Sequence, residues 1–293
     1  MRVIAFLTTV AGMLNLVAAS ADDDGSPGAS SSPDKSRYSL FNPTPRKLMR
    51  PMSTDRPDQT ESPYTVDAGH FQVEMDAVSA VFDRDHSGGS DVQTTSWGTS
   101  LNLKAGLLNN VDIQFVLDPY TRVEVKDFAA GTKDTASGFG EFQTRLKVNL
   151  WGNDGGSTAF AMMPFVKWPL AESSLRNGKT EGGAIFILGY ELPGGWGSAV
   201  MTEFDFVAND TGGYDTEFVN SITFSHDIVG ELGGYVEFFS VVSSAGNVDW
   251  QGQFDVGFTY AVNDNLQLDT GCNFGVTEAA PDFNPFIGLS WRF

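Results

Sequence analysis

Hydrophobic and polar side chains alternate along most of the chain from about residue 69 onward, and no helical period replaces this pattern. Between residues 141 and 150, Phe142 and Leu146 fall on one face, whereas Arg145 and Lys147 fall on the other. Because successive side chains of a β-strand point to opposite sides, the pattern predicts strands with one apolar and one polar face. The alternating apolar faces carry no Asp, Glu, Lys or Arg. This is expected of surfaces that contact lipid, where an Arg or Lys at mid-depth costs about 2–4 kcal/mol.

About twelve segments share this alternation, and a typical one has about 11 residues, the length that a membrane-spanning strand needs. Strands of ordinary globular proteins are shorter, most often roughly 5–6 residues. The predicted strands lie near 69–82, 93–106, 110–118, 138–151, 157–169, 182–192, 196–207, 214–227, 232–243, 249–261, 265–275 and 283–293.

The connections between these segments alternate in length. Tight turns fall at 108–110, 152–156, 193–195, 228–230 and 262–264, and longer polar loops fall at 83–92, 119–137, 170–181, 208–213, 244–248 and 276–282. Short turns at one end and long loops at the other are typical of outer-membrane barrels. The sequence therefore predicts an all-β fold, a transmembrane up-and-down antiparallel β-barrel of about twelve strands over residues 67–293. Both chain ends are expected on the short-turn, periplasmic side.

The N-terminus has the pattern of a secretory signal peptide. A positive Arg2 precedes a mostly apolar run to Val17, and small residues follow it, so we expect residues 1–21 to be removed after Ala21. A retained membrane anchor is the less favoured alternative, because the apolar run is short for a membrane helix. Residues 22–66 are poor in apolar side chains at first and then contain several prolines, which predicts a disordered or extended periplasmic linker.

The chain ends on an alternating segment that closes with Trp291 and Phe293. A terminal aromatic residue on such a strand is similar to the C-terminal signal of bacterial outer-membrane proteins. This resemblance implies that the outer-membrane assembly machinery recognises Trp291 and Phe293. The closing strand of a soluble barrel or sandwich is the alternative.

Charge and composition limit the chemistry that the chain can perform. The 293 residues carry 18 Lys and Arg against 37 Asp and Glu, a formal net charge of −19, which argues against a nucleic-acid partner. Cys272 is the only cysteine, and His70, His86 and His226 lack metal-ligand spacing. No phosphate-binding loop, dinucleotide fingerprint or nucleophile elbow occurs. We expect no catalytic residues, no metal and no cofactor.

If the apolar faces contact lipid, the polar faces line the lumen and become the candidate functional residues. They are Glu74, Asp76, Lys104, Asp112, Glu141, Arg145, Lys147, Glu203, Asp205, Glu217, Glu237, Asp255, Asp269 and Arg292. Acidic side chains predominate, which favours a solute pathway that attracts cations. The alternative is a salt-bridged plug, in which opposed charges fill and close the interior. A twelve-strand barrel lies between filled barrels and wide porins, so its width leaves both interpretations open.

Several short stretches resemble one family of outer-membrane barrels. They are residues 54–63, reading TDRPDQTESP, residues 69–74, reading GHFQVE, residues 163–169, reading MPFVKWP, and residues 234–238, reading GYVEF. In these stretches the chain, over roughly 54–293, resembles the family described as "putative MetA-pathway of phenol degradation". The resemblance implies an outer-membrane transporter and adds hydrophobic or aromatic compounds as candidate solutes.

The favoured function is thus an outer-membrane channel or transporter for passive passage of small solutes, with membrane lipids and a small-molecule solute as partners. One alternative is a non-conducting structural or surface-interaction barrel in the same membrane. A second alternative is a secreted, soluble β-sandwich binding module.

Overall fold

The computed structural model describes residues 34–86, 89–176, 178–246 and 248–293. Within these ranges, thirteen strands and one short 3-10 helix, Arg46–Leu48, are formed, and no helix is long and apolar enough to cross a membrane. The strands are β1 (Phe71–Asp85), β2 (Val92–Leu108), β3 (Val111–Asp127), β4 (Thr132–Gly138), β5 (Phe142–Trp151), β6 (Thr158–Trp168), β7 (Glu181–Leu192), β8 (Trp196–Ala208), β9 (Tyr214–Val229), β10 (Leu232–Ser243), β11 (Gln251–Asn263), β12 (Leu266–Gly275) and β13 (Phe283–Arg292).

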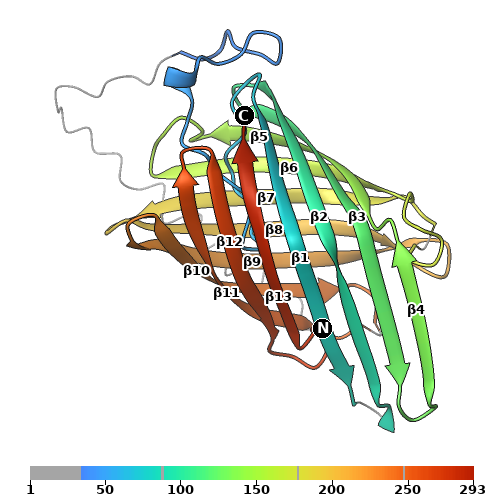
Figure 1. The fold of residues 1–293 in the computed structure, drawn as a ribbon. Helices are drawn as coiled ribbons and strands as arrows, with labels where there is room; N and C mark the ends of the chain where they lie inside the picture. The colour runs from blue at the N-terminus through green and yellow to red at the C-terminus, as the bar shows by residue number, and fades with distance from the viewer. Residues whose placement is uncertain (1–33, 87–88, 177, 247) are drawn as a thin grey trace. The chain divides into compact units, whose positions relative to one another are not determined.

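Twelve of the strands in the described residues form a closed antiparallel barrel. From β5 to β13 each strand pairs with the next, β13 pairs with β1, and β1, β2 and β3 lead back to β5. Figure 1 shows β13 beside β1, where the last strand of the chain meets the first. Closure leaves none of these twelve strands as an open edge, so backbone groups within the lipid layer are paired. The predicted barrel is confirmed, and the alternative of a β-sandwich is wrong.

One predicted loop is a hairpin instead. The sequence pattern predicts a loop over 119–137, but β3 continues to Asp127, and β4 pairs with its second half from Thr121 onward. The continuation alternates β-branched and charged side chains, which suits an exposed strand. Lys126 and Lys133 both place their ammonium groups 2.9 Å from the Glu124 carboxylate. Pairing across the hairpin therefore extends β3 beyond the barrel wall (Figure 1).

The barrel wall separates apolar from charged side chains as the alternation predicts. On β5, the Leu146 side chain is exposed at 38%, whereas the neighbouring Lys147 is completely buried. The same contrast separates the exposed Phe254 from the buried Asp255 on β11. Apolar side chains exposed on the outside of a closed barrel form the surface that a lipid bilayer covers.

Part of the inner wall is apolar, which the sequence analysis did not expect. Six buried residues of β6 to β9 form a hydrophobic cluster, with Phe165, Phe239 and Val241 packed against it. These six are Ala161, Met163, Ile185, Ile187, Met201 and Val219. Their strands carry apolar side chains on both faces, so simple alternation hides which face is inside. The lumen therefore has one apolar side and one charged side.

Candidate functional site: a loop inside the lumen

The chain before β1 is bonded to the short-turn end of the barrel. The Lys35 ammonium lies 2.7 Å from Asp154 in the β5–β6 turn. The Arg50 guanidinium donates to the Asn109 side chain at 2.8 Å and to Asp154 at 3.1 Å. The Arg292 guanidinium of β13 donates to the Arg50 carbonyl at 2.8 Å. These contacts fix the point at which the chain enters the barrel.

From there, residues 51–66 form a segment that we call the lumen loop. Successive residues of the loop contact successive strands of the barrel wall. Asp55 contacts β1, β2 and β5, and Arg56 contacts β12. Gln59 then contacts β11, and Thr60 contacts β10 and β9. The segment returns past Asp112 of β3, whose carboxylate accepts from the Val66 N–H at 3.0 Å. A segment bonded to the inner faces of strands around the whole circumference must lie inside the lumen.

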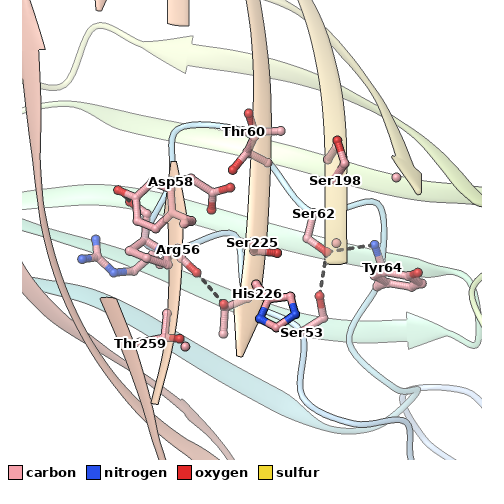
Figure 2. Close-up of a pocket in the computed structure, with 18 of the residues that line it drawn as sticks. Ser53, Arg56, Asp58, Thr60, Ser62, Tyr64, Ser198, Ser225, His226 and Thr259 are labelled. Atoms are coloured by element: carbon pink, nitrogen blue, oxygen red, sulfur yellow. Dashed lines mark hydrogen bonds between the residues drawn. The ribbon is translucent and has the colours of Figure 1, made fainter. Parts of the chain in front are cut away.

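Two hydrogen bonds close the lumen loop on itself. The hydroxyl groups of Ser53 and Ser62 lie 2.7 Å apart, and the Ser62 N–H donates to the Asp55 carboxylate at 2.9 Å. Figure 2 shows Ser53, Ser62 and Tyr64 grouped beside Ser225 and His226 of β9. The loop is therefore a compact body inside the barrel, and its two ends lie together.

Asp55 is the most strongly held charge of the loop. It is buried against the ammonium groups of Lys104 and Lys147, the second at 2.5 Å, and its N–H donates to Glu74 at 3.1 Å. Although burial opposes ionisation, the two ammonium groups hold the pKa of Asp55 well below its ordinary value. Asp55 therefore stays a carboxylate, and the two lysines give it a specific position on the wall.

Arg56 binds two acids of the barrel wall. Its guanidinium lies 2.6 Å from Asp76 of β1 and 2.7 Å from Asp269 of β12, and its Cζ lies 5.6 Å from the centre of the Phe286 ring. A planar guanidinium with five donors can serve two carboxylates at once. Arg56 therefore ties β1 and β12 to the loop with a single side chain.

The tip of the loop is held by hydrogen bonds from its backbone. The N–H groups of Gln59 and Thr60 donate to the two Glu237 oxygens at 2.8 and 2.7 Å. The side-chain amide of Gln59 donates to the Asp255 carboxylate at 2.8 Å. Glu61 turns to the other side, where Arg145 lies 2.5 Å from its carboxylate. Glu237 of β10 thus positions the loop backbone, and Asp255 of β11 positions the Gln59 side chain.

Two inward-facing glycines make room for this segment. A Cβ on Gly106 of β2 would overlap the backbone carbonyl groups of Val66 and Asp67, and a Cβ on Gly288 of β13 would overlap the Arg56 guanidinium. Any side chain at Gly106 would displace the chain that leaves the lumen. The lumen loop therefore fits the barrel wall for two reasons: these two wall positions have no side chain, and charged groups of the wall pair with charged groups of the loop.

Two cavities lie on either side of the lumen loop. The turn-side cavity, about 430 Å³, is lined by Gly197 of β8 and Gly233 of β10, near the short turns. The distal cavity, about 330 Å³, is lined by Glu203 and Phe239, which lie farther along the same two strands. Both cavities are also lined by loop residues 56–58 and Glu61. The loop therefore lies between them along the barrel axis.

The predicted lumen residues divide into two groups. Ten bond to residues 34–66: Glu74, Asp76, Lys104, Asp112, Arg145, Lys147, Glu237, Asp255, Asp269 and Arg292. In the described residues, no hydrogen bond or ion pair joins the other four to this segment; they are Glu141, Glu203, Asp205 and Glu217. Glu141 instead pairs with Lys167 of β6.

The chain before β1 differs from the free linker that the sequence suggested. The described part, residues 34–66, is bonded to the barrel, and Lys35, Asp55 and Thr60 are buried. The low apolar content of this segment predicts no packing against the barrel, because the segment is held by charged residues on strands that are distant in sequence. One signal for this docking was available in the sequence, namely the cluster of charged and polar residues in 54–63, which also carries the family resemblance. The expected signal peptide, residues 1–21, lies outside the described residues.

The remaining expectations concern the chain end and metal binding. Trp291 and Phe293 are half exposed, at 50% and 52%, and their role in assembly stays a prediction. Across the described residues, no three His, Cys, Asp or Glu side chains are arranged to hold a metal ion.

Several solved structures share this fold at low sequence identity. An outer membrane channel from Pseudomonas putida F1 matches with a TM-score of 0.59 and 12% identity, covering 82% of this chain and 100% of that chain. The translocator domain of the autotransporter NalP from Neisseria meningitidis matches with a TM-score of 0.50 and 8% identity over 76% of this chain and 88% of that one. The transport unit of the autotransporter AIDA-I from Escherichia coli has a TM-score of 0.50 and 10% identity, covering 76% and 90%.

The family of the chain is shown by comparison of its sequence with family models. No curated protein matches the chain. A family model, in contrast, matches residues 54–293, which include the lumen loop from Thr54 onward and the entire barrel. The protein belongs to the family described as "Putative MetA-pathway of phenol degradation".

Proposed function

We propose that this protein is an outer-membrane channel for the passive passage of small solutes, and that the lumen loop narrows its pathway. The single observation that carries this proposal is the pair of cavities on either side of the loop, inside a closed barrel with an apolar exterior. A structural barrel needs no such cavities, because side chains can fill a small lumen.

The proposal combines the two interpretations of the lumen charges. The ten residues that bond to segment 34–66 hold it in place and act as the salt-bridged plug. Glu203 lines the distal cavity, and we propose that Glu141, Asp205 and Glu217, which also have no bonds to the segment, line the pathway beyond it. The solved structures with this fold are described as a channel, a translocator domain and a transport unit, which supports passage rather than catalysis.

The location follows from the same features. A closed barrel with exposed aromatic and aliphatic side chains suits the outer membrane, whose lipids would cover them. We propose that residues 1–21 direct export, that the assembly machinery recognises Trp291 and Phe293, and that residues 34–50 face the periplasm together with the short turns. Hydrophobic or aromatic solutes are the candidates that the family description adds.

Planar-bilayer recording of the mature full chain tests the proposal. We expect stepwise currents, and we expect larger steps for Asp55→Asn, because the loop then loses its ion pairs with Lys104 and Lys147. Asp34→Asn, at an exposed acid outside the lumen, is the matched control and should behave like the wild type.

Folding must be shown in the same preparation by heat-modifiable migration on gels. Folded protein that gives no current steps, in either the wild type or Asp55→Asn, would reject the channel. That result would favour the non-conducting structural barrel.

A further inference from the structure

The distal cavity is lined by both apolar and charged residues. Val116, Met201 and Phe239 line it from β3, β8 and β10. Met201 belongs to the hydrophobic cluster of the inner wall, against which Phe239 packs. Charged residues of the lumen loop and of β1, β5 and β8 line it as well. Such a lining suits a solute that has both an apolar body and a polar group.

The charged lining residues are predominantly acidic. Six carboxyl groups and two guanidinium groups line the cavity; they are Asp55, Asp58, Glu61, Glu74, Asp76 and Glu203, and Arg56 and Arg145. Both guanidinium groups are already paired, Arg56 with Asp76 and Arg145 with Glu61. Glu203 forms no ion pair within the described residues. The cavity therefore has carboxyl oxygens that can accept from a cation and no free guanidinium for an anion.

Two buried acceptors at this cavity have no donor. In the part of the chain that the structure describes, Glu61 Oε2 and Asn102 Oδ1 make no hydrogen bond, and both residues line the cavity. The other atoms of these groups are occupied, because Glu61 Oε1 accepts from Arg145 and Asn102 Nδ2 donates to Gln114. Buried acceptors usually have partners, so a ligand that donates N–H groups to Asn102 and to the ionised form of Glu61 would complete them.

We propose that the distal cavity binds small organic cations, namely an ammonium group carried on a compact aromatic or aliphatic body. The ammonium group donates to Glu61 and Asn102 and is balanced by Glu203, while the body packs against Met201 and Phe239. A volume of about 330 Å³ lies at the lower end of small-molecule sites and suits a single-ring amine. The proposal rests on the proposed function, since it names the class of solute that the channel would take.

Isothermal titration of the folded full chain in detergent tests this proposal, with benzylammonium as the probe. Benzoate and benzyl alcohol share its ring but lack the positive charge, and we expect them to bind at least about tenfold more weakly. Glu203→Gln should weaken benzylammonium binding about fivefold or more and leave benzyl alcohol unaffected. Phe239→Ala should weaken it through the loss of apolar contact. Glu278→Gln, at an exposed loop acid, is the matched control and should bind as the wild type does.

Binding and conductance separate the two proposals. Equal binding of the three probes, or none, in a protein that conducts would overturn the cation site and leave the channel intact. Selective benzylammonium binding by a protein that never conducts would support the site and reject the channel. An unchanged affinity in both Glu203→Gln and Phe239→Ala would show that the probe binds elsewhere and would also overturn the assignment.

Discussion

Two carboxyl groups of the lumen loop, Asp55 and Glu61, have opposite electrostatic surroundings. Asp55 lies between Lys104 and Lys147 and remains ionised. Burial and the nearby Asp55 carboxylate raise the pKa of Glu61 to about 7, in spite of its contact with Arg145. One carboxyl group therefore anchors the loop at all ordinary pH values, while the other makes docking depend on pH.

The sign of this dependence follows from linkage. Glu61 has an ordinary pKa of 4.5 and one of about 7 when the loop is docked, so the docked state holds the proton more tightly. Its contribution to docking is complete below pH 4.5 and is lost as the pH rises to about 7. We expect channel conductance to increase over this range, measured in bilayers at constant salt.

Glu61→Gln should remove most of this increase, because its side chain does not titrate. Asp58 lies beside Glu237, and burial and that carboxylate raise the pKa of Asp58 well above its ordinary value, so a residual increase should reflect this group. Glu278→Gln should keep the wild-type profile. A Glu61→Gln protein with the full wild-type pH dependence would contradict the assignment.

At the scale of the elements, the barrel strands were predictable and the lumen loop was not. Alternation identifies strands such as β5 because lipid and lumen require different side chains on its two faces. The hairpin of β3 and β4 was missed because its charged, exposed residues resemble a loop. The lumen loop was missed because its partners are distant in sequence: Asp55 binds Lys147, 92 residues away. Local patterns cannot show such pairing.

Gly106 of β2 offers a direct test of how the loop fits the wall. Gly106→Val places a branched side chain against the carbonyl groups of Val66 and Asp67, and such overpacking costs about 1–3 kcal/mol. Since 1.4 kcal/mol corresponds to a factor of about ten in an equilibrium, we expect the undocked fraction to rise about tenfold. Faster proteolysis of the lumen loop in folded protein would measure it.

The control for this variant is Gly246→Val, because a side chain at Gly246 meets no atom within 4 Å. Its proteolysis rate should equal that of the wild type. Equal rates for Gly106→Val and the wild type, with both barrels folded, would mean that the loop does not depend on this close approach.

At the scale of the whole molecule, the lumen keeps an excess of acid after the loop has docked. Lys104, Lys147 and Arg145 are engaged by loop carboxylates, whereas Glu203 and Asp205 have no bonds to the loop. Neutralising both acids, as Glu203→Gln with Asp205→Asn, should lower the preference for cations, seen as a smaller reversal potential in a salt gradient. An unchanged reversal potential would exclude these residues from the pathway.

The lumen loop is attached at both of its ends to the short-turn side of the barrel, at Arg50, which donates to Asn109, and at Asp67, whose carboxylate lies 4.0 Å from the Arg292 guanidinium. It is thus an intramolecular blocker, present at an effective concentration that the tether sets and that dilution of the protein cannot change. Each channel should close and reopen as an independent first-order unit. A free peptide of the same sequence would have to compete against that local concentration, so added peptide should block poorly unless the tethered copy has first been displaced.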